Sequence, residues 1–299
     1  MNVENASQVR GLARGPAESF RHPRRSGAPG ARLLADQLAA VRRDYDSLRR
    51  AMYEAAQQQR KLCGPRLLRR GPYEVASEIF PVRDLSGDFT CVFEHSSDLV
   101  FAIGDIAGKG LSAAMWFTHV VGLVRLQIEA LKDPAAVLSA INRDLLLSRL
   151  GLPLTTMFLA RLDTRTGEVT YCSAGHPPTV VLRSRGRIDS LHEGGPVLGV
   201  LPDAQFVNGR TFLYPGDALL GYSDGIAECR NEHGVEYGAE RVTDVARLFQ
   251  AAGASSVLFS VLGAAEDFAG SRSREDDMAL IVVHRSLIGN GHEKTYGHV

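Results

Sequence analysis

The clearest hydrophobic pattern in this chain is a seven-residue repeat near its start. Apolar residues recur at alternating spacings of four and three, with Gln59 and Leu62 continuing the register, at Leu34, Leu38, Val41, Tyr45, Leu48, Met52 and Ala55. Such a stripe follows one face of a helix and is typical of a coiled coil. We expect a helical linker over residues 32–63, which either packs on its own domain or dimerises through residues 32–62, the arrangement that we favour.

After this helix the pattern changes to short apolar runs and a few longer helical periods. The runs predict strands over residues 74–80, 89–93, 99–103, 157–162, 169–173, 179–183, 218–222 and 278–284. The longer periods predict helices over residues 112–131, 134–150, 239–250 and 255–268. Because strands come in runs and helices in pairs, the expected fold class is α+β, with antiparallel sheets rather than alternating βαβ units.

Composition and charge exclude several classes of protein. Residues 1–31, rich in Arg, Gly and Pro, are expected to form a flexible arm, and residues 286–299 a loose tail. The 34 basic and 34 acidic residues balance, which argues against a nucleic-acid partner. We see no apolar run of membrane-spanning length and no leader, so no membrane partner is expected. The four cysteines form no CxxC pair, and we expect reduced thiols in a cytoplasmic protein.

Candidate chemistry lies in aspartates at predicted strand ends. Asp88 precedes one strand, Asp105 and Asp224 follow two others, and Asp276 and Asp277 precede the last. Alone, each could belong to an ordinary turn. Gathered at one edge of a sheet, the carboxylates would raise one another's pKa, and divalent cations with oxygen ligands would relieve that conflict. Two such metals can activate a water and clamp phosphoryl oxygens.

Other motifs suggest competing interpretations. Residues 221–225 fit GxSxG, the nucleophile elbow of serine hydrolases, but we expect a polar turn after Ala227 where that motif needs a helix. Residues 104–110 lack the hydroxyl of a phosphate loop, so Lys109 is expected to be a solvated side chain. His176 is expected to be a hydrogen-bonded structural histidine.

Five stretches of the sequence together carry a family resemblance. They are PVRDLSGDF…FAIGDIAGKGLSAA within 81–114, LTTMF at 154–158, AGHPP at 174–178, LGYSDGIAE at 220–228 and EDDMAL at 275–280. Their order and spacing over residues 70–285 resemble the bacterial PPM-type (protein phosphatase 2C-like) serine/threonine phosphatases of the sporulation stage II E and stress-regulator class. The resemblance implies a phosphatase domain over residues 70–285, folded as an αββα sandwich of two antiparallel sheets flanked by helices.

The same resemblance implies a chemistry and a set of site residues. Two Mn²⁺ or Mg²⁺ ions per site would activate water for direct attack on a phosphoserine or phosphothreonine, without a phospho-enzyme. The partner would be a phosphorylated regulatory protein like an anti-sigma-factor antagonist. The implied metal ligands are Asp88, Asp105, the carbonyl of Ile106, Asp224 and Asp276, with Asp277 able to exchange with Asp276. Arg83 stands where some relatives have a phosphate-binding arginine.

The chain also departs from the family pattern. The family often has a second acid shortly after the motif that contains Asp88, but here Phe89 is followed by Thr90 and Cys91. Ala279 replaces a common threonine. The alternative function is a catalytically weak or silent regulatory scaffold of the same fold. Such a scaffold would be expected to lose metal aspartates, and none of the four core aspartates is lost.

Overall fold

The computed structural model describes residues 29–148 and 153–287. The chain divides into two units, the first ending at Leu48 and the second beginning at Arg49, and each is described by itself. The predicted arm over residues 1–31 and the tail over 286–299 lie largely outside the described residues.

The helix predicted from the heptad pattern is present as α1 (Pro29–Leu62). Within the first unit its apolar stripe is exposed, at Leu34, Leu38, Val41, Tyr45 and Leu48. The helix ends just before Gly64, which has a φ of 87° that only glycine adopts readily. A turn of this kind lets the chain leave the helix and enter the first sheet.

The second unit contains two sheets. In the first sheet the strands pair in the order β1 (Leu67–Arg70), β2 (Tyr73–Phe80), β12 (Met278–Arg285), β11 (Ala218–Tyr222), β7 (Thr179–Leu182) and β8 (Ile188–Leu191). In the second the order is β10 (Gly209–Phe212), β6 (Glu168–Ala174), β5 (Thr155–Asp163), β4 (Asp98–Ile106) and β3 (Phe89–His95), with the short β9 (Gly194–Gly195) parallel to β6. All other pairs are antiparallel, as predicted.

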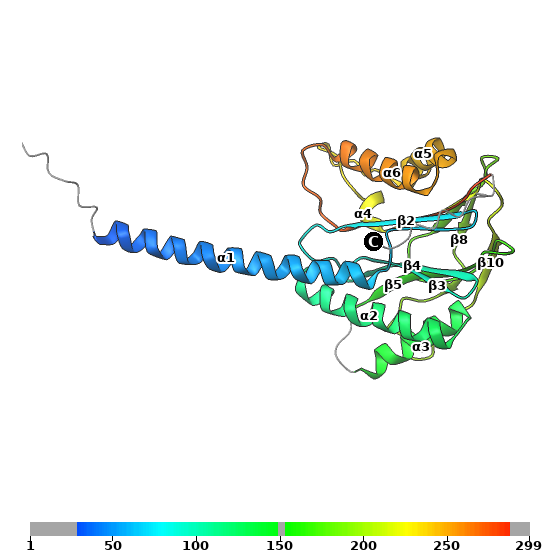
Figure 1. Ribbon diagram of the computed structural model, residues 1–299, viewed down its shortest axis with the longest axis horizontal. Coiled ribbons are helices and arrows are strands. Elements are labelled where there is room, and N and C mark those ends of the chain that lie inside the picture. Colours follow the sequence, from blue (N-terminus) through cyan, green and yellow to red (C-terminus); the bar gives the residue numbers. More distant parts are fainter. Residues whose placement is uncertain (1–28, 149–152, 288–299) are drawn as a thin grey trace, which may run out of the picture. The chain divides into compact units, whose positions relative to one another are not determined.

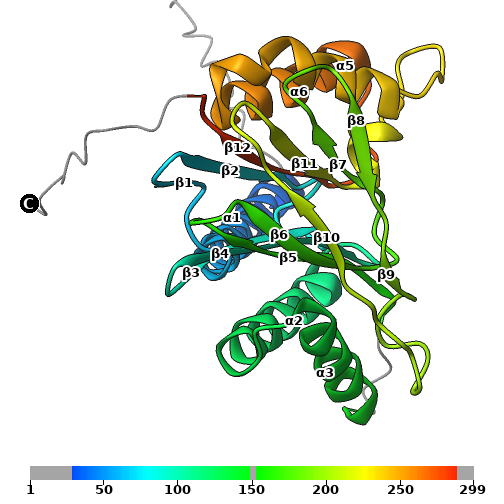
Figure 2. The same cartoon turned by 90° about the vertical axis from the view of Figure 1, so that its right-hand side faces the viewer.

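Two pairs of helices cover the outer faces of the sheets, as Figures 1 and 2 show. The helices α2 (Leu111–Ala130) and α3 (Pro134–Leu147) lie against the second sheet, and α5 (Ala239–Phe249) and α6 (Ala254–Ala269) against the first. This arrangement of two antiparallel sheets between helix layers is the predicted αββα sandwich. Residues 149–150, the end of the predicted third helix, lie outside the described residues.

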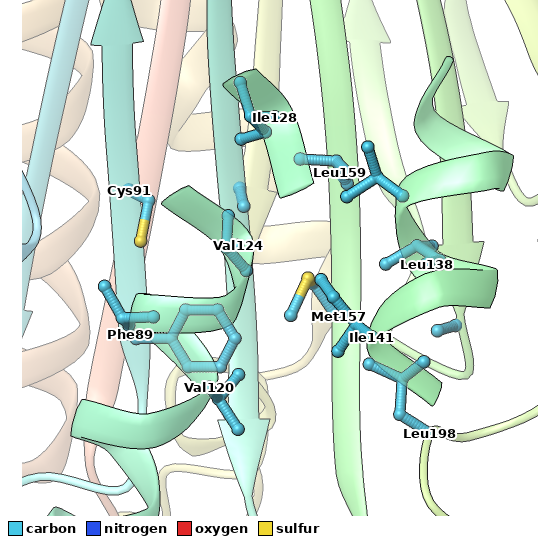
Figure 3. Packing of buried hydrophobic residues seen from close by; sticks show 14 of the residues in the cluster. Phe89, Cys91, Val120, Val124, Ile128, Leu138, Ile141, Met157, Leu159 and Leu198 are labelled. Carbon is cyan, nitrogen blue, oxygen red and sulfur yellow. The ribbon is translucent and has the colours of Figure 1, made fainter. Parts of the chain in front are cut away.

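Three hydrophobic clusters hold the layers together. Figure 3 shows the one between α2, α3 and the second sheet, where Phe89, Val124, Leu138 and Met157 meet. A second cluster fills the space between the sheets and a third lies under α5 and α6. Central strands are therefore buried on both faces, which explains why their sequences read as continuous apolar runs.

The helix α2 is rich in apolar residues, and among the described residues it is the one helix long and apolar enough to cross a membrane by length and composition alone. Seven of its side chains are buried in the domain, Phe117 and Val124 among them. Such burial is also found in the core helices of globular domains.

Candidate metal centre

The aspartates singled out in the sequence meet at one end of the sandwich. In the second sheet Phe89 pairs with Gly104, so the residue before β3, Asp88, lies beside the end of β4, where Asp105 stands. In the first sheet Tyr222 pairs with Leu280, so Asp224 follows β11 where Asp276 and Asp277 precede β12. Antiparallel pairing therefore gathers residues that are far apart in sequence.

Asp277 joins the two sheets at this end. Its Oδ1 accepts a hydrogen bond from the Val82 amide at 2.6 Å, and its Oδ2 accepts from Ser86 Oγ at 2.8 Å and the Gly87 amide at 2.9 Å. The side chain is buried. With three hydrogen bonds from one loop, this carboxylate fixes the segment that leads into Asp88.

Asp276 faces a different environment. Its Oδ1 accepts from the Asp277 amide at 2.9 Å, and its Oδ2 lies 2.9 Å from Lys109 Nζ. The side chain is 49% exposed and lines a cavity of about 260 Å³ together with Asp224. Of the two adjacent acids, Asp276 is the one open to a ligand from solvent. Lys109, expected to be simply solvated, is ion-paired.

Burial and neighbouring carboxylates both disfavour the ionised forms of Asp88 and Asp105. Burial, and after it the Asp105 carboxylate, raises the pKa of Asp88 well above its ordinary value. Burial, the Asp224 carboxylate, and then Asp276 and Asp277 raise the pKa of Asp105 to about 6. Asp88 Oδ2 is buried and has no hydrogen-bond partner among the described residues. A buried, unpaired carboxylate oxygen beside other carboxylates fits a cation.

The donor set is the one that Mg²⁺ and Mn²⁺ prefer. It consists of carboxylates and the Ile106 backbone carbonyl. A Cβ on Gly87 would lie 2.8 Å from the Ile106 carbonyl oxygen, so only glycine lets the loop before Asp88 approach this carbonyl so closely. Across the described ranges, no three acidic, histidine or cysteine side chains already form a group that could hold a metal. The residues therefore fit these cations by the type of their oxygen donors and by their location at one end of the sandwich.

His176 supports the strand that carries Asp105. Its Nδ1 lies 3.0 Å from Thr156 Oγ1, and that hydroxyl accepts the Asp105 amide at 3.3 Å. Burial lowers the pKa of His176 to about 3, so the imidazole is neutral near pH 7. The expectation of a hydrogen-bonded structural histidine is confirmed.

Gln59, near the end of α1 and within the second unit, was seen in the sequence only as a continuation of the heptad register. Its Nε2 donates to the carbonyls of Ser86 at 3.1 Å and Ala114 at 3.5 Å, and its Oε1 accepts from the Ser86 amide at 3.4 Å. Gln59 therefore clamps the loop before Asp88. A polar residue at an apolar register position was the one signal for it.

Arg83 is exposed, and its Nη1 lies 3.4 Å from the position that a Cβ on Gly110 would take. It therefore stands beside the loop that follows Asp105. A role in binding phosphate stays a prediction.

The structure argues against a serine nucleophile, although one detail of our expectation was wrong. A one-turn helix, α4 (Asp224–Ala227), does follow the GxSxG sequence. However, Ser223 is fully buried, its Oγ accepts the Ala279 amide at 2.9 Å, and β11 is antiparallel to both neighbours. A nucleophile elbow needs an exposed hydroxyl at the end of a parallel strand.

A two-sheet sandwich between helix layers, with carboxylates gathered where the strands end, is the arrangement expected of the PPM class of protein phosphatases. Residues 95–286 match the family model described as stage II sporulation protein E (SpoIIE). The chain therefore belongs to the SpoIIE family and is a protein serine/threonine phosphatase of the PPM type.

Individual relatives agree with this family. The phosphoserine phosphatase RsbU of Bacillus subtilis is 27% identical over 78% of this chain and 69% of its own length. The chain spans only 32% of a second relative, IcfG of Synechocystis, and 37% of a third, RsbP of Bacillus subtilis.

Solved structures show the same fold. The SiaA-PP2C domain of Pseudomonas aeruginosa has a TM-score of 0.70 at 18% identity, covering 81% of this chain and 98% of that domain. RsbX in complex with magnesium has a TM-score of 0.56 at 14% identity, covering 74% of this chain and 98% of that chain.

Proposed function

We propose that this chain is a divalent-metal-dependent phosphatase of phosphorylated regulatory proteins, with its metals held by Asp88, Asp105, Asp224 and Asp276. The observation that carries the proposal is the buried Asp88 oxygen without a hydrogen-bond partner, among carboxylates that raise one another's pKa. The Ile106 carbonyl would complete the set of oxygen donors. Asp277 accepts three hydrogen bonds from the loop over residues 82–87 and would hold this loop, which leads into Asp88, in place.

The metals, Mn²⁺ or Mg²⁺ and two per site, would when bound supply an activated water and neutralise phosphoryl charge. The chain's own residues prepare this arrangement. Asp88 and Asp105, in their ionised forms, would offer carboxylate oxygens to the cations, and the hydrogen bonds of Asp277 and Gln59 hold the Asp88 loop in place. Neutral His176 and Thr156 fix the strand at Asp105. Arg83, beside the loop after Asp105, would bind the phosphate of the substrate.

The proposed substrate is a phosphoserine on a cytoplasmic regulatory protein that resembles an anti-sigma-factor antagonist. The similarity to RsbU, whose name gives its activity as a phosphoserine phosphatase, supports this choice. An open cavity beside Asp224 and Asp276 offers room for a protein side chain. We also propose a homodimer through residues 32–62, because the apolar heptad positions of α1 are exposed.

The alternative function, a catalytically silent scaffold, predicts that some of the metal-binding aspartates are lost. The positions of the four core aspartates at the meeting strand ends favour the enzyme instead. Hydrolysis of p-nitrophenyl phosphate and of a phosphoserine peptide by the full chain, with Mn²⁺, with Mg²⁺ and with EDTA, tests the proposal. Turnover that requires a metal and resists serine-directed reagents is the expected result. Turnover unaffected by EDTA would contradict it.

A further inference from the structure

The ammonium of Lys109 connects two segments that carry proposed metal ligands. Lys109 lies in the loop that follows Asp105 and Ile106. Its Nζ is 2.9 Å from Asp276 Oδ2 and donates to the Glu275 carbonyl at 2.5 Å. A positive charge therefore already stands at one of the carboxylates where a divalent cation would bind.

Both carboxylate oxygens of Asp276 have a partner within the protein when no metal is bound. Oδ2 pairs with Lys109, and Oδ1 accepts the Asp277 amide. A divalent cation that approaches Asp276 must either displace the ammonium or bind beside it against charge repulsion. The ion pair, with side chains 39% and 49% exposed, is open enough for the ammonium to leave into water.

Lys109 stands between two glycines in this loop. Gly108 and Gly110, on either side, have φ values of 114° and 80°, which glycine adopts readily. No atom lies within 4 Å of the position that a Cβ on Gly108 would take. The ammonium sits on a flexible four-carbon stem, so it can move without disturbing Asp105.

We propose that Lys109 is a built-in counter-ion for Asp276, which holds this carboxylate in the absence of metal and weakens the binding of a divalent cation at that position. The proposal rests on the proposed function, because it takes Asp276 as a metal ligand. Lys109 would thereby raise the concentration of divalent cation at which the site fills.

Calorimetric titration of the metal-stripped full chain with Mn²⁺ tests this proposal. Lys109→Met removes the charge and keeps the unbranched stem up to the Cε position, and it should tighten the weaker Mn²⁺ site about tenfold, since one nearby unit charge is lost at a partly exposed position. The gain should shrink at high salt. Lys109→Arg, which keeps the charge, should bind Mn²⁺ within about twofold of the parent protein.

Arg272→Gln is the matched control. Arg272 lines the same cavity but pairs with Glu275, not with Asp276. Its variant should leave the Mn²⁺ affinity unchanged. Unchanged or weaker binding in Lys109→Met, or equal tightening in Arg272→Gln, would overturn the counter-ion role.

Asp88→Asn and Asp224→Asn separate this inference from the proposed function. If both variants lose Mn²⁺ binding while Lys109→Met binds like the parent, the metal centre stands and only the role of Lys109 fails. If the parent binds no Mn²⁺, or if both aspartate variants bind it as the parent does, the metal centre fails and the counter-ion role with it.

Discussion

Ser86 Oγ donates a 2.8 Å hydrogen bond to Asp277 Oδ2, and this contact joins segments 191 residues apart in the sequence. It links the loop before β3 in one sheet to the start of β12 in the other. The end of the sandwich where the carboxylates gather therefore depends on Asp277 for its shape, while the neighbouring Asp276 remains open to solvent.

The division of roles between Asp276 and Asp277 predicts effects of different size from the same substitution. Asp277→Asn places amide hydrogens against the donors of Ser86 and Gly87, and should lower the free energy of unfolding of the metal-free protein by about 2–3 kcal/mol. Asp276→Asn loses one partly exposed ion pair and should change it by less than about 1 kcal/mol. Urea denaturation with EDTA measures both values. Equal losses in the two variants would refute this assignment.

The carboxylate cluster predicts a pH dependence of the metal-free fold. The pKa of Asp105 is raised from its ordinary value of 3.8 to about 6, chiefly by burial and then by the Asp224 carboxylate. The folded state therefore binds the extra proton, and the contribution of Asp105 to stability falls as pH rises from about 4 through 6. Thermal unfolding in EDTA should show this decline.

Two comparisons test the origin of that decline. Asp105→Asn cannot ionise and should show a smaller loss of stability over the same pH range. Adding Mn²⁺ above pH 6 should raise the melting temperature of the parent protein, because the cation binds the ionised carboxylates of the folded state. If Asp105→Asn keeps the full decline, another group is responsible.

The clamp by Gln59 predicts that the Asp88 loop loosens when its hydrogen bonds are removed. Gln59→Leu should lower the free energy of unfolding by about 1–3 kcal/mol, because the buried amide and carbonyl of Ser86 lose their partner. Amide hydrogen exchange near Ser86 should become faster. Gln58→Leu, one position earlier and exposed, is the matched control and should leave both measurements unchanged. Equal effects in the two variants would exclude a specific clamp.

The exposed stripe of α1 predicts a dimer. Light scattering of the parent protein should give twice the mass of one chain, and Leu48→Asp should halve it, because a charge in the apolar seam of a coiled coil is costly. Arg43→Asp introduces the same side chain off the stripe and should stay dimeric. A parent protein that is monomeric at micromolar concentration would rule this dimer out.

The elements with the strongest patterns were predictable from the sequence, and the weak ones were not. Helix α1 and the central strand β11 follow from heptads and from a continuous apolar run. The strands β1, β8 and β10 were missed because each has only four residues at a sheet edge and is partly exposed, so its sequence carries little apolar signal. The helix α4 was missed because it is a single turn.

The site was predictable as a set of aspartates, but not in its internal contacts. Turn glycines and strand ends pointed to Asp88, Asp105 and Asp224. The different settings of Asp276 and Asp277 arise from a loop nearly two hundred residues away in sequence, which no local pattern reveals. The pairing of Lys109 with Asp276 is of the same kind, since it depends on tertiary contacts.

The most direct test of the central claim compares Asp224→Asn with Asp244→Asn, a matched change at an exposed position on α5. Phosphate released from a phosphoserine peptide in saturating Mn²⁺ is the quantity measured. We expect Asp224→Asn to lower the rate at least about a hundredfold, because a metal ligand is lost, and Asp244→Asn to match the parent protein. Full activity in a folded Asp224→Asn variant would contradict the proposed metal centre.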